Sequence, residues 1–85
     1  MKKKPWFVYI IECRDNSLYT GISNNLKNRI EAHNKGKGSK FTRWRFPVKL
    51  VYQEKCVTRS AALKREAEIK DLPRIKKLEL INKAL

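Results

Sequence analysis

The chain begins with two short apolar runs, at residues 6–13 and 18–22, on either side of a polar stretch. The first run is almost continuously hydrophobic, which favours a strand that is covered on both faces. Between the runs lie Arg14, Asp15 and Asn16. Asp and Asn stabilise turns because their side chains bond the neighbouring backbone. Two apolar runs around a short polar turn predict a β-hairpin.

The register of this hairpin depends on the length of its loop. We take residues 14–16 as a three-residue turn that ends with an asparagine in the left-handed conformation. Tyr9 then pairs with Gly21, and Tyr19 comes to the same face as Tyr9. Because glycine has no side chain, this register predicts an open space beside the Tyr9 hydroxyl. A shift of one residue would send the two tyrosines to opposite faces.

The remaining pattern predicts three helices and one more strand. A helix over residues 25–34 starts among good N-cap residues and stops at Gly36. A third strand follows at residues 48–56, and then a helix at 59–71. Pro73 fits the first turn of a last helix. The order ββαβαα indicates an α+β fold, in which three helices pack on a three-stranded antiparallel sheet.

The helix predicted over residues 25–34 carries two candidate functional side chains. Leu26 and Ile30 form its inward stripe. Arg29 and His33 are spaced i, i+4, so they share one face of the helix. His33 is the single histidine of the chain. Imidazole titrates near neutral pH, so it suits proton transfer, and the structural alternative is a solvated surface histidine.

One carboxylate interrupts the apolar face of the helix predicted over residues 59–71. At about 100° per residue, Ala62, Leu63 and Ile69 define that face, and Glu66 falls in its middle. A carboxylate in such a place is costly unless it is paired or bound to a cation. The two interpretations are a buried salt bridge with an Arg or Lys and a metal ligand.

The net charge of the chain is its strongest indication of a binding partner. The chain of 85 residues holds 21 Lys and Arg against 8 Asp and Glu, a formal net charge of +13. Such an excess repels itself in the compact state and indicates a polyanionic partner, above all nucleic acid. A hydrophobic content of 41% is enough for one small core. We expect a single domain at residues 6–85 after a basic flexible tail at 1–5.

The segment KGKGSKFTRWRFP, residues 35–47, is the basic loop of the chain. Basic side chains contact phosphates, and aromatic ones stack on unpaired bases. The alternative for Phe41 and Phe46 is packing at the edge of the core. Trp44 is the better stacking candidate because arginines flank it. The residues that we expect to bind nucleic acid are Lys35, Lys37, Lys40, Arg43, Trp44 and Arg45.

The cysteines and the apolar segments argue for a reduced, non-membrane setting. Cys13 and Cys56 lack metal-ligand spacing, so we expect buried thiols rather than a zinc site or a disulfide. No apolar segment approaches the length that spans a bilayer. The apolar run after the N-terminal lysines is too short for a signal peptide. The expected location is the cytoplasm, without a membrane partner.

The tripeptides VYI at residues 8–10 and YTG at residues 19–21 resemble the paired motifs of the GIY-YIG nuclease superfamily. Arg29, His33 and Glu66 follow in the order of the family's later residues, and the resemblance covers nearly the whole chain. Within that superfamily, the chain is similar to the small stand-alone bacterial members whose role is unassigned. Valine replaces the first glycine of one motif and threonine the isoleucine of the other, which alters packing rather than chemistry.

This resemblance implies a metal-dependent endonuclease that hydrolyses phosphodiester bonds in DNA. Tyr9 would be the general base, which needs a pKa below its usual value of about 10; we expect Arg29 and a metal to lower it. His33 would relay the proton, and Tyr19 would orient the phosphate or water. Glu66 would hold Mg²⁺ or Mn²⁺, with waters and the phosphate completing the shell.

Two alternatives stay open. One is a module that binds DNA or RNA with the nuclease fold but cleaves weakly or not at all. The other is a nuclease subunit that needs a protein partner for specificity, because the chain has no added recognition domain. The sequence leaves open the choice of DNA or RNA, the substrate's structure and sequence, independent cleavage, the oligomeric state and the pathway.

Overall fold

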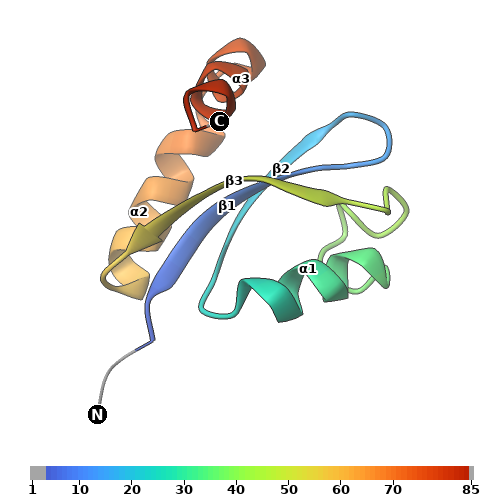
Figure 1. Ribbon diagram of the computed structural model, residues 1–85, viewed down its shortest axis with the longest axis horizontal. Helices are drawn as coiled ribbons and strands as arrows, with labels where there is room; N and C mark the ends of the chain where they lie inside the picture. The colour runs from blue at the N-terminus through green and yellow to red at the C-terminus, as the bar shows by residue number, and fades with distance from the viewer. Residues whose placement is uncertain (1–3, 85) are drawn as a thin grey trace.

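The computed structural model describes residues 4–84, so residues 1–3 of the predicted basic tail lie outside it. The elements follow the predicted order ββαβαα (Figure 1). Their bounds are β1 Trp6–Glu12, β2 Leu18–Ser23, α1 Leu26–Asn34, β3 Lys49–Cys56, α2 Arg59–Lys70 and α3 Arg74–Lys83. None of the described helices is both long and apolar enough to cross a membrane. The predicted α+β fold is confirmed.

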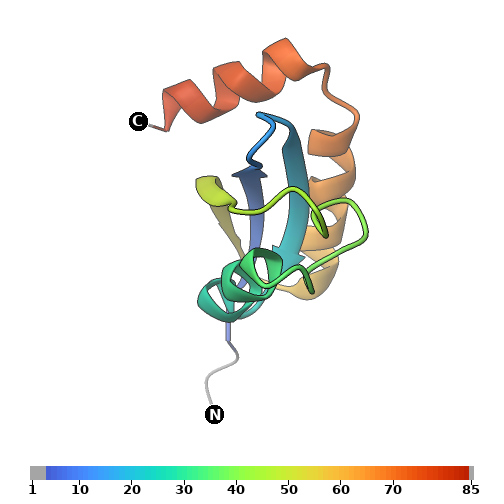
Figure 2. The same cartoon turned by 90° about the vertical axis from the view of Figure 1, so that its right-hand side faces the viewer.

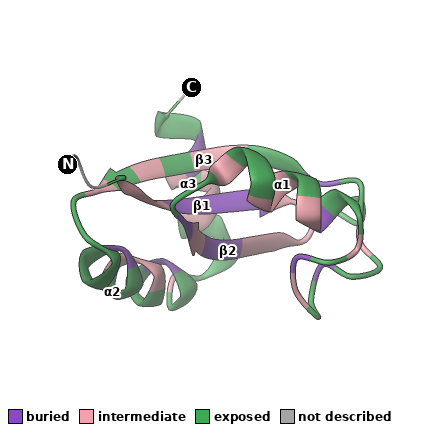
Figure 3. Ribbon diagram, turned by 90° about the horizontal axis from the view of Figure 1, so that it is seen from below, coloured by how far each residue is buried: buried purple, intermediate pink, exposed green. Residues whose placement is uncertain are grey.

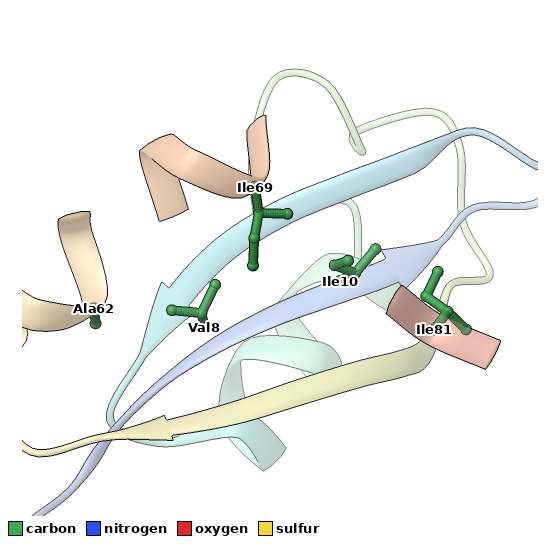
Figure 4. Close-up of a cluster of buried hydrophobic side chains, with 5 residues drawn as sticks. All are labelled: Val8, Ile10, Ala62, Ile69 and Ile81. Atoms are coloured by element: carbon green, nitrogen blue, oxygen red, sulfur yellow. The ribbon is translucent and has the colours of Figure 1, made fainter. Parts of the chain in front are cut away.

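The sheet is antiparallel in the order β2-β1-β3, so β1 runs through its centre. Neighbouring side chains of a strand point to opposite faces, and each face of β1 is covered. On one face, Val8 and Ile10 pack against Ala62 and Ile69 of α2 and Ile81 of α3 (Figure 4). These five side chains are the buried centre of the larger core cluster.

The other face of the sheet packs against α1. Its buried residues are Tyr9, Ile11, Cys13 and Val48, and Tyr19, Leu26 and Ile30 pack around them. Burial on both sides makes β1 the most deeply enclosed strand, as the burial colours show (Figure 3). The continuous apolar run in the sequence is therefore explained, because a central strand has no solvent-facing side.

The hairpin has the predicted register. Tyr9 pairs with Gly21 and Ile11 with Tyr19, and Asn16 takes the left-handed conformation with φ 69°. The expected open space at Gly21 is absent. A Cβ atom added there would lie 2.6 Å from the Tyr9 hydroxyl oxygen, because the phenol ring itself lies over the glycine. Gly21 therefore makes room for Tyr9 rather than for a ligand.

Local capping places the helices. The Asn25 side chain accepts a hydrogen bond from the backbone of Asn28 at the start of α1, and Gly36 follows the helix with φ 75°. Thr58 accepts from the backbone of Ala61 at the start of α2, at 3.0 Å. Such caps satisfy backbone groups that a helix terminus leaves without partners, so these boundaries are encoded locally.

Two apolar side chains of the last two helices, one of them Leu63 of the predicted apolar face, do not join the core. Leu63 of α2 is 38% exposed and Ile75 of α3 is 66% exposed. Ile75 lies in the first turn of α3, whereas that helix reaches the sheet through its later residues Leu78, Leu80 and Ile81. The helical period gives the direction of a side chain, and only the packing of the helix decides which turns reach the sheet.

Candidate functional site

Three aromatic side chains from three different elements meet on the α1 face of the sheet. The Tyr9 hydroxyl of β1 and Nε2 of His33 in α1 form a hydrogen bond of 2.9 Å. The Tyr19 ring of β2 lies edge-on to the His33 ring, with 5.3 Å between the ring centroids. The Tyr9 and Tyr19 centroids are 6.5 Å apart. The hairpin register therefore places Tyr9 and Tyr19 on the same face of the sheet, where His33 of α1 meets both.

His33 is fully buried, so the alternative of a solvated histidine is wrong. Burial, and then the positive charge of Arg29, lower the pKa of His33 to about 4. Both effects disfavour the imidazolium, because a buried cation loses hydration and a nearby cation repels it. At neutral pH the imidazole is therefore neutral, with one nitrogen able to accept a proton.

Arg29 lowers the pKa of Tyr9, as predicted, but in the protein without a metal this effect is outweighed. Burial raises the pKa of the fully enclosed Tyr9 phenol, and the hydrogen bond and charge of Arg29 offset this only in part. Desolvation disfavours the phenolate, which would carry its charge into a poorly hydrated site. The Tyr9–His33 pair is accordingly uncharged at rest.

Arg29 brings a positive charge next to this uncharged pair. Its Nη2 donates a hydrogen bond of 2.7 Å to the backbone oxygen of Gly38. Among residues 4–84, its Nε is the buried side-chain polar atom that lacks a hydrogen-bond partner. A buried donor without a partner is costly and is typical of a site that an external acceptor completes. The fork-shaped guanidinium suits two oxygens of one phosphate.

The basic loop closes over His33. Thr42 is fully buried, and its Oγ1 lies 2.7 Å from His33 Nδ1 and 3.0 Å from the Oγ of Ser39. Gly38 packs so closely on the imidazole that an added Cβ would overlap the ring. The sequence analysis missed Thr42. A single threonine in an irregular basic segment has no periodicity or motif that would have marked it.

A stack of side chains ties the basic loop to β2, beside which it runs (Figure 2). Phe41 stacks on Tyr19 with 5.8 Å between the ring centroids, and the Arg45 guanidinium lies 4.3 Å from the Phe41 centroid. Arg45 also pairs with Asp15 at 3.0 Å. Phe41 and Arg45 therefore hold the loop in place, which leaves Arg45 less available to a ligand than its sequence suggested.

The outer surface of the basic loop remains available. Trp44 is 73% exposed, and the Arg43 guanidinium lies 5.4 Å from the centre of its ring. Lys35, Lys37, Lys40 and Arg43 are also exposed. Three of these basic residues line an open hollow of about 360 Å³ together with Gly36 and Ser39; they are Lys37, Lys40 and Arg43. Its charge and shape fit a phosphate backbone.

Glu66 comes from α2, the helix that packs on the other face of the sheet. Its side chain is 18% exposed, and the carboxylate lies 3.4 Å from Nζ of Lys70 on the same helix. Lys70 is 51% exposed, so the pair is not the deeply buried salt bridge that one interpretation required. The negative charge of Glu66 also helps to raise the pKa of Tyr9, although its effect is smaller than those of burial, Arg29 and Tyr19.

These residues could hold a divalent ion only if waters and the substrate phosphate supplied most of its ligands. The described residues contain no cluster of three His, Cys, Asp or Glu side chains that would hold a metal by themselves. Glu66 offers one carboxylate, held only by an ion pair with the half-exposed Lys70. Mg²⁺ commonly binds through one or two carboxylates and keeps its waters and the substrate phosphate as further ligands. The residues are compatible with that weakly held arrangement.

Comparison with known proteins finds similar sequences that match most of the chain. The family model described as the GIY-YIG catalytic domain matches residues 5–79. A UPF0213 protein of Staphylococcus aureus strain Mu3 is 57% identical over 75 residues, which cover 88% of this chain and 92% of the relative.

Two solution NMR structures are similar in fold as well as in sequence. The UPF0213 protein BH0048 from Bacillus halodurans has a TM-score of 0.60 at 41% identity and covers 92% of this chain and 83% of its own. Protein EF2693 from E. faecalis has a TM-score of 0.65 at 37% identity, and the match covers 96% of this chain and 88% of that protein's chain. The GIY-YIG superfamily is one of nucleases, generally endonucleases that use a divalent metal. With its family motifs on adjacent strands of the matched fold, the chain belongs to the GIY-YIG catalytic domain family and is similar within it to the small bacterial UPF0213 proteins.

Proposed function

We propose that this protein is a divalent-metal-dependent endonuclease that hydrolyses phosphodiester bonds in DNA. The observation that carries the proposal is the hydrogen bond of 2.9 Å between the Tyr9 hydroxyl and His33 Nε2, next to an arginine with an unpartnered buried Nε. A base, a proton acceptor behind it and an anion-binding group are the parts that phosphodiester hydrolysis requires.

Tyr9 acts as a base by passing its own proton onward. Because its pKa is raised, the phenol is protonated at rest and must lose that proton to accept another. His33 is neutral at pH 7 and accepts the phenolic proton on Nε2 while the phenol oxygen takes one from the attacking water. The water oxygen bonds to phosphorus and the leaving oxygen departs, taking a proton from solvent. His33 then returns its proton to solvent.

Arg29 and Tyr19 bind and orient the phosphate. The Arg29 guanidinium stabilises charge on two phosphate oxygens through paired hydrogen bonds. Its existing bond to the Gly38 carbonyl holds it beside Tyr9 before substrate arrives. The half-buried Tyr19 hydroxyl orients the phosphate or the attacking water. Tyr9 is fully enclosed, so substrate entry requires the side chains around its hydroxyl to move.

Glu66 would hold the metal, Mg²⁺ or Mn²⁺, with waters and a phosphate oxygen as its other ligands. When bound, such an ion polarises the phosphate and stabilises the developing charge on the leaving oxygen. Lys70 neutralises Glu66 in its absence, through the i, i+4 pair at 3.4 Å. The half-exposed lysine can swing into solvent at little cost, because surface pairs of this kind contribute only about 0.3–0.5 kcal/mol.

The exposed side chains of the basic loop contribute affinity rather than chemistry. Lys35, Lys37, Lys40 and Arg43 contact phosphates, and the exposed Trp44 stacks on an unpaired base. Arg45, paired with Asp15, serves mainly to anchor the loop. DNA is the substrate in this proposal because the resemblance to the nuclease family implies it, whereas the charge alone suits any nucleic acid.

A second candidate function is nucleic-acid binding without cleavage. The specific observation in its favour is the complete burial of Tyr9, together with the raised pKa of its phenol. A base that stays enclosed and protonated when nucleic acid binds performs no hydrolysis. The two candidates share the fold and the charged surface and differ in whether bound substrate opens the site.

The deciding experiment is incubation with duplex, branched and single-stranded DNA, and with RNA, in the presence of Mg²⁺, Mn²⁺ or a chelator. We expect metal-dependent cleavage of DNA that Tyr9→Phe lowers by about 10²–10⁴-fold, the usual range for general acid–base groups. Tyr52→Phe is the matched control, because the Tyr52 hydroxyl bonds Glu54 on β3. Binding without cleavage on every substrate would favour the second candidate.

A further inference from the structure

We propose that Thr42 is a positioning residue that holds the proton of neutral His33 on Nδ1, so that Nε2 faces Tyr9 with its lone pair. The inference rests on the proposed function, since it concerns the same proton path. The observation that carries it is a continuous series of hydrogen bonds from Tyr9 through His33 and Thr42 to Ser39.

The direction of the first bond follows from the surroundings of the Tyr9 hydroxyl. Tyr9 is fully buried, and within residues 4–84 its hydroxyl has one hydrogen-bond acceptor, His33 Nε2 at 2.9 Å. Arg29, which lies close to it, is a cation that can only donate, and the more weakly acting Tyr19 and Glu66 form no hydrogen bond with it among the described residues. The Tyr9 proton therefore points to Nε2, because a buried hydroxyl proton without an acceptor is costly.

The second bond then has only one direction. A neutral imidazole carries a single N–H, so a lone pair on Nε2 means that the proton is on Nδ1. Nδ1 lies 2.7 Å from Thr42 Oγ1 and donates to it. A side chain without an oxygen at position 42 would leave this buried N–H unsatisfied. Loss of this partner would weaken the preference for a proton on Nδ1, so that the form protonated at Nε2, the nitrogen that the proposed path needs unprotonated, competes with it even though Tyr9 then loses its acceptor.

The Thr42 hydroxyl completes the series because it has acceptors of its own. Ser39 Oγ lies 3.0 Å from Thr42 Oγ1 and also accepts the backbone N–H of Thr42 at 3.1 Å. Thr42 Oγ1 lies 3.5 Å from the Ser39 carbonyl oxygen as well. Accepting from His33 and donating to Ser39, the threonine uses both of its roles, as a buried hydroxyl should.

Threonine suits this position because it is uncharged. The groups that face His33 are Tyr9 of β1, Tyr19 of β2, Arg29 of α1, and Gly38 and Thr42 of the basic loop. Arg29 is the one charged group in this set. A carboxylate in place of Thr42 would favour the imidazolium, which cannot accept a proton from Tyr9. A hydroxyl orients the ring and leaves it neutral.

Nitrogen NMR of the imidazole tests the proposal without any substrate. His33 is the only histidine, so ¹⁵N-labelled histidine gives one assignable pair of ring signals. At pH 7 we expect a protonated Nδ1 and an unprotonated Nε2 in the wild type. Thr42→Val should shift the tautomer populations measurably towards the form protonated at Nε2, and Thr42→Ser should restore the original pattern. Thr20→Val, at another buried threonine, is the control.

The wild-type spectrum keeps the test decisive even if Thr42→Val folds poorly. A proton on Nε2 in the wild type, or unchanged tautomer populations in folded Thr42→Val, would overturn the assignment. In cleavage assays we expect Thr42→Val to lose roughly 10- to 100-fold, the range for groups that orient a functional histidine, with Thr42→Ser near wild type. Absence of cleavage by the wild type would refute the proposed function while leaving the tautomer result to stand or fall by itself.

Discussion

At the scale of single residues, burial decides the protonation states of the site. The Tyr9 phenol and the His33 imidazole are both enclosed, and each has its pKa moved away from neutrality, upwards for the phenol and down to about 4 for the imidazole. Arg29 reinforces the second shift and opposes the first. The resting pair is therefore neutral and hydrogen-bonded, which makes transfer of a proton between them part of the reaction rather than of the ground state.

The depressed pKa of His33 predicts that stability falls in mild acid. Between the ordinary pKa of 6.5 and the folded value of about 4, the unfolded chain binds a proton that the folded chain does not. Stability is therefore fully present above pH 6.5 and is lost as the pH falls towards 4. At about 1.4 kcal/mol per pH unit, we expect a loss of roughly 2 kcal/mol between pH 6.5 and 5.

Thermal unfolding measured at a series of pH values checks this, with His33→Gln as the comparison. The variant should be less stable than wild type at pH 7, because a buried network is broken. Its melting temperature should change less between pH 6.5 and 5. Equal slopes for the two proteins would mean that the titration of His33 does not control acid stability.

At the scale of elements, the candidate site residues come from helices that pack on opposite faces of the sheet. Tyr9, Tyr19, Arg29 and His33 gather between the sheet and α1. Glu66 belongs to α2 on the other side, yet its charge contributes to the pKa of Tyr9. Helix α2 packs on both β1 and β2, and β2 is an edge strand.

Glu66→Gln should abolish cleavage while leaving nucleic-acid binding and folding nearly intact. The carboxylate pairs with the half-exposed Lys70, so we expect a change in stability within about 0.5 kcal/mol. Mg²⁺ or Mn²⁺ should raise the melting temperature of the wild type but not of the variant. Calorimetry, DNA binding and cleavage are to be measured on the same preparations.

Glu68→Gln is the matched control for the metal prediction. Glu68 lies on the same helix, is 56% exposed and pairs with Arg65 at 3.4 Å. Its substitution should change neither cleavage nor the response to metal. Strong destabilisation by Glu66→Gln, together with no thermal response of the wild type to either ion, would count against the assignment of Glu66 as the metal ligand.

At the scale of the whole molecule, the positive charge is larger than a small folded domain needs. A net charge of +13 on 85 residues opposes compaction, and the two clusters of buried side chains on either face of β1 hold the fold against it. The basic loop concentrates part of this charge on a surface with an exposed tryptophan. A polyanion that binds there relieves the repulsion, so binding should both stabilise the protein and depend strongly on salt.

Removing two lysines from the basic loop should flatten the salt dependence of DNA binding. If Lys37 and Lys40 each neutralise one phosphate, the slope of log affinity against log salt should fall by about 1.8 on B-DNA, at about 0.9 for each contact. Lys55→Ala with Lys64→Ala, on β3 and α2, removes the same charge from exposed positions elsewhere. Fluorescence anisotropy over a salt series gives both slopes. Equal slopes in the two double variants would show that the loop is not the binding surface.

Local chemistry in the sequence was enough to predict the elements and the hairpin. Asn16 supplies the left-handed turn, the three-residue loop sets the register that pairs Tyr9 with Gly21, and Asn25 and Thr58 cap their helices. These features depend on contacts within a few residues or across one tight turn, so they are legible in the sequence. The family resemblance added the order of residues that the fold brings together.

Only the tertiary structure decided how the site is solvated and what completes it. The Tyr9 ring fills the space at Gly21, packing between the sheet and α1 encloses Tyr9, and the basic loop closes over the neutral His33. Thr42 reaches His33 in the same way. An irregular loop has no period from which its contacts can be calculated, and a pKa depends on every group that packs around it. The sequence determined which side chains are available to this site; packing determined which of them are charged, buried and in contact.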